Sequence, residues 1–378
     1  MSKRNEPDWA SISTRVAFFI GGFGISSWAP LVPYAKSRLG IDEGVLGLLL
    51  LCLGAGSIVT MPISGAFAAR FGCRFMITVA SLFIGFSLPL LATAETITAL
   101  IVALLVFGAA LGAIDVAINI QAVIVETASG KALMSGFHGF WSIGGIAGAG
   151  FISGLLGSGM SPMTAALCAS GIIAILVITF GKHLLPYGSK AKDAPLLVMP
   201  KGIVLFIGAL CFIAFLAEGA ILDWSALFLT TMRNVDFAYA GFGYSLFAVT
   251  MTLGRLCGDR VVQKFGGRKI LIFGGGCAAA GLALAIIIPH WLAAFIGFGL
   301  VGLGASNIVP VLFSALGRQQ VMPVNLAVSS VTTLGYSGIL AGPALVGFVA
   351  HATSLAVAFT GVAALLLVIT ASSRAVMK

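Results

Sequence analysis

Runs of about twenty apolar residues recur along almost the whole of this sequence, and they constrain its fold more than any other feature. A transmembrane helix needs about 20 predominantly apolar residues to cross about 30 Å of hydrocarbon. Only 9% of the 378 residues are charged, against roughly 25% in soluble globular domains. Twelve candidate spans lie at residues 15–34, 44–69, 75–94, 97–125, 133–157, 163–181, 203–230, 238–262, 270–288, 292–316, 325–349 and 354–373. The sequence therefore predicts an all-α integral membrane protein with twelve transmembrane helices.

Lysine and arginine are unevenly shared between the two sides of this arrangement. If both termini lie on one side, that side collects 18 of the 21 basic residues, and Lys36, Arg38 and Arg233 remain on the other. Cytoplasmic loops of membrane proteins carry such an excess of positive charge. We therefore expect both termini in the cytoplasm. The net charge of +9 then reflects topology rather than nucleic-acid binding.

An internal repeat divides the chain. Residues 182–202, KHLLPYGSKAKDAPLLVMPKG, form a long polar interval with six candidate spans on each side. The two sides match at an offset of about 193 residues: SRLGIDEGVLG (37–47) with MRNVDFAYAG (232–241), ARFGCR (69–74) with QKFGGR (263–268), and LGAIDVAI (111–118) with LGASNIVP (303–310). The last match pairs Asp115 with Asn307. We predict an N-terminal six-helix bundle at residues 1–181, a cytoplasmic linker at 182–202 and a C-terminal six-helix bundle at 203–378.

Two parallel six-helix repeats joined by a cytoplasmic linker are the plan of the major facilitator superfamily, and the chain resembles that family. The loop GAFAARFGCR (65–74) is similar to the family signature G-x-x-x-D-R-x-G-x-R, although Ala69 stands where the signature has its acid. The second-half loop, GRLCGDRVVQKFGGRK (254–269), supplies Asp259 one turn earlier, four residues after Arg255. The resemblance implies a cytoplasmic gate with an Arg255–Asp259 pair, the alternative being a solvated helix end. The implied gate residues are Arg70, Arg74, Arg255, Asp259 and Arg260.

Four further motifs carry a narrower resemblance. DVAINIQ (115–121), FHGFWSIGG (137–145), AEGAILDW (217–224) and GYSGILAGP (335–343) are similar to the bacterial YbjJ-type group and, more distantly, to the fucose–proton symporters. This likeness implies a multi-pass protein of the bacterial inner (plasma) membrane. It also places Asp115, Asn119 and His138 at polar positions of the fourth and fifth spans. The acid that the symporters carry in their first span has no counterpart between Arg15 and Tyr34, so the sugar is not implied.

Asp115 and Asn119 are four residues apart, which places them on one face of a helix. Counted from the turn near Glu126, His138 lies at nearly the same height on the next span. An acid inside a membrane is costly unless it is paired or hydrated, and histidine titrates near neutrality. We therefore predict a proton or substrate site in the inner half of the first bundle. The alternative is a buried pair that holds spans four and five together.

Glu218, beyond the midplane of the seventh span, is a second candidate for the proton site. Its alternative role is a hydrogen bond to a neighbouring backbone or hydroxyl group. Asn307 and Tyr336 complete the predicted cavity. Asp223 and Trp224 are expected near the outer interface, where an acid and a tryptophan are ordinary.

These features predict a secondary active transporter that moves a small solute by alternating access, coupled to protons. The alternatives are a proton-driven exporter of a drug or metabolite and a non-transporting membrane sensor with the same fold. Residues 273–281, FGGGCAAAG, lack the Lys-Ser/Thr ending of a phosphate-binding loop, so ATP-driven transport is not expected. We predict no enzymatic activity, cofactor, metal or nucleic-acid partner. The expected partners are a small-molecule substrate, protons and the lipid bilayer around a monomer.

Overall fold

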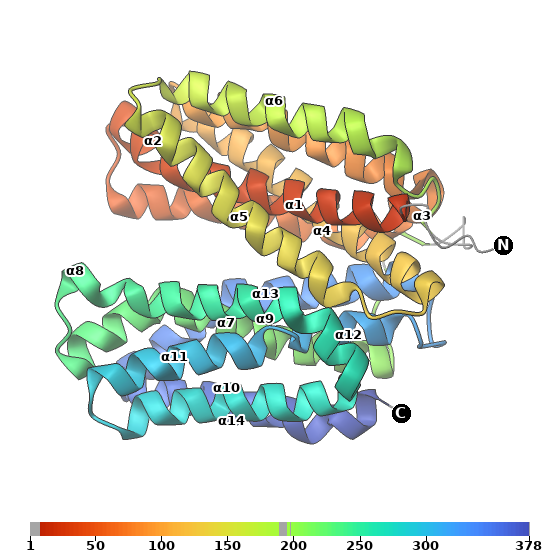
Figure 1. Ribbon diagram of the computed structural model, residues 1–378. Coiled ribbons are helices and arrows are strands. Elements are labelled where there is room, and N and C mark those ends of the chain that lie inside the picture. The colour runs from red at the N-terminus through yellow and green to blue at the C-terminus, as the bar shows by residue number, and fades with distance from the viewer. Residues whose placement is uncertain (1–7, 189–194, 197, 378) are drawn as a thin grey trace. The chain divides into compact units, whose positions relative to one another are not determined.

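The computed structural model describes residues 8–188, 195–196 and 198–377, and every regular element within them is a helix (Figure 1). Part of the predicted linker and five of the basic residues used to predict orientation lie outside these ranges: Lys3, Arg4, Lys190, Lys192 and Lys378. The helices before the linker are α1 (Trp9–Trp28), η1 (Ala29–Leu31), α2 (Val32–Leu39), α3 (Glu43–Thr93), α4 (Ile97–Ser129), α5 (Met134–Gly157), α6 (Pro162–Phe180) and η2 (Gly181–His183). Those after it are α7 (Ile203–Arg233), α8 (Phe237–Ala240), α9 (Phe242–Phe265), α10 (Gly267–Ile287), α11 (Trp291–Ala305), α12 (Ile308–Leu316), α13 (Val324–Ala352) and α14 (Leu355–Val376).

Ten helical segments in the described part of the chain are long and apolar enough to cross a membrane. One of them, Gly44–Thr93, contains two consecutive spans, because Gly72 interrupts α3 with a φ of 85° and a ψ of 157°. α9 is 24 residues long but is not among the ten; it is less apolar than they are and carries four charged residues, Arg255, Asp259, Arg260 and Lys264. With α3 taken as two spans and α9 as one, the helices agree with the twelve predicted spans. The predicted all-α membrane architecture is confirmed.

The span predicted at 292–316 is divided into α11 and α12 in the structure, with Ser306 and Asn307 between them. Pro310 explains the break. Proline has no N–H to donate to the carbonyl of Ser306, and its ring collides with that carbonyl in a straight helix. Asn307 adopts a φ of −110° and a ψ of 3° at the junction. Its repeat counterpart Asp115 lies instead inside the continuous helix α4.

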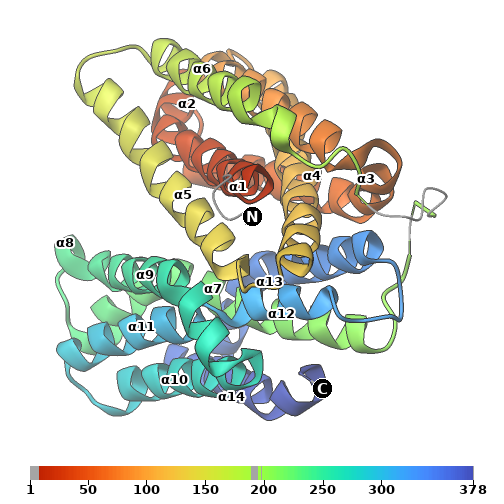
Figure 2. The same cartoon turned by 45° about the vertical axis from the view of Figure 1, so that its right-hand side comes forward.

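The chain divides into two compact units. The first comprises Met1–Ser129, Phe140–Met199 and Pro323–Ser329, and the second comprises Gly130–Gly139, Pro200–Met322 and Ser330–Lys378. In the first unit α3 packs along α4, and α1 and α6 pack against them. In the second unit α10 packs between α11 and α14 (Figures 1 and 2). The helices α5 and α13 each begin in one unit and continue into the other.

Arg38 and Arg233, two of the three basic residues predicted on the outer side, each cap the end of a helix. Arg38 donates from Nε to Ala94 O (2.8 Å), from Nη1 to Ala92 O (2.5 Å) and from Nη2 to Leu91 O (3.1 Å), just where α3 ends. Arg233 Nη2 donates to Ala285 O (2.6 Å) and Ile286 O (2.8 Å) near the end of α10. The last carbonyls of a helix lack intrahelical partners and form its negative pole. These repeat-related arginines therefore join α2 to α3 and α7 to α10.

Candidate functional site

The Asp115–Asn119 pair lies on α4 in the first unit. Asn119 Nδ2 donates to the backbone oxygen of Asp115 (2.9 Å) and to its carboxylate Oδ1 (3.0 Å). The Asn119 side chain is buried, and Asp115 is half-buried. The four-residue spacing thus produces the shared face that the sequence predicts. The amide stabilises the carboxylate without neutralising it, so an ionisable group is held inside a membrane-spanning helix.

Gln121, the next polar residue on α4, has a structural role that the sequence did not reveal. Its Nε2 donates to Thr14 Oγ1 on α1 (2.9 Å), and its Oε1 accepts from the backbone N–H of Leu185 (3.1 Å). Gln121 therefore ties the first helix and the start of the linker to α4. Nothing in the local sequence could have named these partners, because they are separated from it by 107 and 64 residues.

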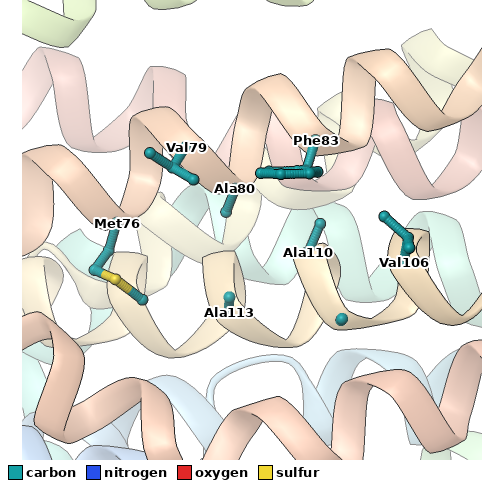
Figure 3. A pocket seen from close by; sticks show the side chains of 8 residues that line it. Met76, Val79, Ala80, Phe83, Val106, Ala110 and Ala113 are labelled. Carbon is teal, nitrogen blue, oxygen red and sulfur yellow. The ribbon is translucent and has the colours of Figure 1, made fainter.

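An apolar cavity of about 260 Å³ lies between the second part of α3 and α4 (Figure 3). Its eight lining residues are all apolar: Met76, Val79, Ala80, Phe83, Val106, Ala109, Ala110 and Ala113. At 100° per residue, Asp115 lies on the opposite side of α4 from Ala113. A polar solute would find no hydrogen-bonding side chain in this lining, so we do not place the candidate site here.

His138 belongs to the second unit, whereas Asp115 belongs to the first. Its imidazole lies beside the ring of Phe313, with centroids 6.0 Å apart and planes at 53°. Arg255 is close enough to interact with it electrostatically. The structure therefore groups His138 with α9 and α12, and the predicted partnership with Asp115 stays a prediction.

Arg255 and Glu218 form an ion pair between α9 and α7. The Arg255 Nη2 to Glu218 Oε2 distance is 3.7 Å, and Arg255 is buried. Tyr244, on α9, interacts electrostatically with both groups and with Asp223. The sequence did not reveal this pair, because its partners lie on different helices. The available signal was that both charges fall inside predicted spans, where each one needs a partner.

The Asp259 side chain, on α9, forms a hydrogen bond with the first turn of α5. Its Oδ1 accepts a hydrogen bond from the backbone N–H of Gly136 (2.8 Å), the third residue of that helix. A Cβ on Gly136 would collide with the same carboxylate. An acid at a helix N-terminus satisfies an unpartnered N–H and complements the positive pole. Gln263, one turn later, accepts from Ala132 N (2.9 Å) and extends this contact.

Asn307 occupies the junction of α11 and α12 and contacts α9. Its Nδ2 donates to Gly254 O (3.0 Å) and to Ser306 Oγ (2.9 Å). A Cβ on Gly258 would collide with its Oδ1. The glycines of α9 thus permit the close approach of this amide, which stabilises the broken helix.

The first signature loop holds the start of the linker. Gly72 and its positive φ form the turn, and Arg74 donates from Nε to Leu184 O (2.9 Å) and from its backbone N–H to Leu185 O (2.7 Å). Arg70 is exposed, with its guanidinium 5.5 Å from the centroid of the Phe71 ring. Ala69, at the position of the signature acid, is buried. Arg74 therefore contacts linker carbonyls, and the predicted gate role of these residues stays a prediction.

The remaining predicted residues lie at separate places. Trp224 Nε1 donates to Pro343 O (3.1 Å), which ties α7 to the proline inside α13. Asp223 is exposed next to it, Tyr336 is half-buried on α13, and Arg260 is exposed on α9. Within the second unit, the polar groups that the structure brings together are therefore His138, Glu218, Tyr244 and Arg255.

Sequence comparison identifies relatives along nearly the whole chain. The model of the Major Facilitator Superfamily matches residues 16–320. An uncharacterized MFS-type transporter of Yersinia pestis is 55% identical, over 97% of this chain and 96% of its own length. The membrane protein MosC of Rhizobium meliloti is 31% identical, over 89% of this chain and 83% of its own length.

Solved structures show the same fold. The Escherichia coli fucose:proton symporter FucP superposes with a TM-score of 0.80 at 17% identity, covering 97% of this chain and 98% of that one. The human organic anion transporter TETRAN superposes with a TM-score of 0.77 at 16% identity, covering 98% and 100%. At such identities the likeness concerns the fold alone. Together with the family match and the relatives, it shows that the chain belongs to the major facilitator superfamily of multi-pass membrane transporters.

Proposed function

We propose that this chain is a proton-coupled secondary transporter that moves a small solute across the bacterial inner membrane by alternating access. The observation that carries the proposal is the Arg255–Glu218 ion pair between two membrane-spanning helices. Charged side chains inside a membrane are costly, usually face a cavity or a partner, and mark substrate or ion pathways. The fold of the fucose:proton symporter, which its name describes as proton-coupled, supports the same proposal.

Two acids are candidates for the proton carrier. Glu218 faces a buried arginine, so gain of a proton would release the guanidinium to another partner. Asp115 faces a neutral amide, so it can exchange a proton without breaking an ion pair. Asn119, His138, Asn307 and Tyr336 complete the proposed cavity.

The moving parts in this proposal are the bundles at residues 1–181 and 203–378, joined by the linker at 182–202, with both termini cytoplasmic. Arg70, Arg74, Asp259 and Arg260 form the proposed gate at the cytoplasmic ends. The hydrogen bond from Gly136 N to Asp259 Oδ1 supports this role. It joins the start of α5 to α9, and a gate would break it when these helix ends separate.

Ligand binding by the purified protein tests the proposal. A thermal-shift screen against sugars, organic acids and drug-like cations detects a ligand, because binding to the folded state raises the melting temperature. The affinity for the hit should vary across about pH 5–8 in the wild type. Asp115→Asn or Glu218→Gln should abolish that variation. An affinity that is constant across this range would mean that the solute binds without a proton.

A further inference from the structure

We propose that the apolar cavity between the second part of α3 and α4 holds part of one acyl chain of an anionic phospholipid. The cavity lies within the first unit, between two membrane-spanning segments (Figure 3). Ala80 and Ala110 in its lining are buried, whereas Phe83 is 50% exposed. The cavity is therefore a hollow that opens onto the surface of these two helices, and not an enclosed space in the core.

The surface around the cavity is suited to hydrocarbon. Phe75, Leu82 and Phe86 on α3 and Val102 on α4 are all large, apolar and exposed. An exposed apolar patch marks a site of contact with a membrane or another apolar partner. Since all eight side chains that line the cavity are apolar as well, an alkyl chain can enter it without leaving a polar group unpaired.

The fold alone does not require the cavity, because the corresponding helices of the second unit are in direct contact. The internal repeat aligns Ala80 with Gly274, at the same offset as the two signature loops. A Cβ on Gly274 of α10 would collide with the backbone oxygen of Gly304 on α11, and Cys277 Sγ donates to Leu300 O (3.5 Å). The hollow between α3 and α4 is thus a feature of the side chains of the first unit.

Arg70 supplies a positive charge near the end of the cavity that Met76 lines. Its guanidinium lies 5.5 Å from the ring centroid of Phe71, and that ring lies 5.4 Å from the ring of Phe75. Phe75 directly precedes Met76 in the chain. Arg70 is exposed, and no ion pair to it is recorded in the part of the chain that the structure describes. A phosphate is the complementary partner for this guanidinium.

The positions of the charge and the cavity match the two parts of one lipid. From Met76 to Phe83 the cavity covers about 10 Å along α3, at about 1.5 Å per residue. The predicted orientation places Arg70 at the cytoplasmic surface and the cavity in the adjoining leaflet. Basic sites between membrane-spanning helices on this side bind anionic headgroups. One lipid can therefore place its phosphate at Arg70 and part of one chain in the cavity.

Thermal unfolding of the purified full chain tests the proposal, with phosphatidylglycerol and phosphatidylcholine of identical acyl chains as the probes. In mixed micelles, phosphatidylglycerol should raise the melting temperature saturably, by about 2 °C or more above the value in phosphatidylcholine. Ala113→Leu places a larger side chain in the cavity and should abolish this difference between the lipids. Ala99→Leu, at an exposed position of α4 outside the lining, should retain it.

The headgroup contact is tested in the same assay. Arg70→Gln removes the positive charge and leaves the cavity unchanged, so the two lipids should give equal melting temperatures. Arg318→Gln, which removes an exposed positive charge from the loop after α12, is the matched control and should keep the difference. If Ala113→Leu does not fold, Val79→Phe fills the cavity from α3 and is measured with the same expected loss.

Equal melting temperatures of the wild type in the two lipids would overturn the proposal, and so would a difference that survives the filling of the cavity. A dimer of the wild type that Ala113→Leu converts to a monomer would assign the cavity to a second copy of the chain, and would also overturn it. The assay involves no transport. Its outcome is therefore independent of proton coupling through Asp115 or Glu218.

Discussion

At the scale of single residues, the polar groups of the membrane-spanning helices have two kinds of role. Gln121, Trp224 and Asn307 connect neighbouring segments through hydrogen bonds to neutral groups. Glu218 and Asp115 are ionisable. Their partners are Arg255 and Asn119, and gain of a proton by either acid would alter its interaction with that partner. A substitution that removes charge but keeps size separates the two roles, because packing is preserved while titration is lost.

Asp115→Asn replaces one oxygen with an amide nitrogen and keeps the shape of the side chain. The free energy of unfolding should therefore change by no more than about 1 kcal/mol. If Asp115 carries the proton, ligand affinity should lose its dependence on pH across about pH 5–8. His138→Gln should shift this dependence and not abolish it. A pH profile of Asp115→Asn that overlays the wild type would assign the proton to Glu218.

Gly136→Ala tests the contact between Asp259 and the start of α5. The added methyl group meets the Asp259 carboxylate, and overpacking of this kind typically costs about 1–3 kcal/mol. The melting temperature should fall. Gly150→Ala, on the same helix but with open space around its Cβ position, is the matched control. The Gly150→Ala change should leave the free energy of unfolding unchanged or raise it by up to about 1 kcal/mol, because alanine has a higher helix propensity than glycine. If the two changes shifted the melting temperature equally, the contact between Gly136 and Asp259 would not constrain the size of the residue at position 136.

The pair Asp115–Asn119 was predictable because its partners are four residues apart on one helix. The pair Arg255–Glu218 was not, since it depends on how α7 and α9 are rotated against each other. The spacing of Arg255 and Asp259 also suggested a pair between those two residues, which stays a prediction. The structure records an ion pair from Arg255 to Glu218 and a hydrogen bond from Gly136 to Asp259. Local spacing finds neighbours on a helix, and only the packing shows partners across helices.

At the scale of helices, apolar length predicted the spans well because it is a local property of the sequence. The turn at Gly72 and the break before Pro310 depend on the backbone preferences of glycine and proline. Both residues were visible in the sequence. The capping of α3 and α10 by arginines was not predicted, because it joins helix ends that are 53 and 52 residues apart in the chain.

Arg38→Gln and Arg233→Gln should each lower the melting temperature. Either change removes a charged donor from the carbonyl end of a helix. At these partly exposed positions the free energy of unfolding should fall by about 1 kcal/mol. Arg318→Gln, at an exposed position in the loop after α12, should have little effect. Thermal unfolding of the three variants in one detergent gives the comparison. If all three match the wild type, the arginine caps contribute nothing measurable.

At the scale of the whole molecule, the predicted orientation places α8 on the periplasmic side of the membrane and the loop between α12 and α13 in the cytoplasm. Phe237, 86% exposed in α8, and Gln320, exposed in that loop, are suitable labelling sites. Arg233 is unsuitable because it caps α10. An impermeant thiol reagent should label Phe237→Cys in intact cells and Gln320→Cys only after lysis. The unaltered protein gives the background from native cysteines. The reverse pattern would invert the topology.

Coupling of solute movement to protons through a half-buried carboxylate is tested most directly in liposomes that contain the purified protein and a trapped pH-sensitive dye. When a solute identified by thermal shift is added outside, the lumen should acidify in step with solute entry. Glu218→Gln or Asp115→Asn should abolish this signal, and Asp223→Asn should retain it. Solute entry with no change of lumenal pH in the wild type would contradict the account.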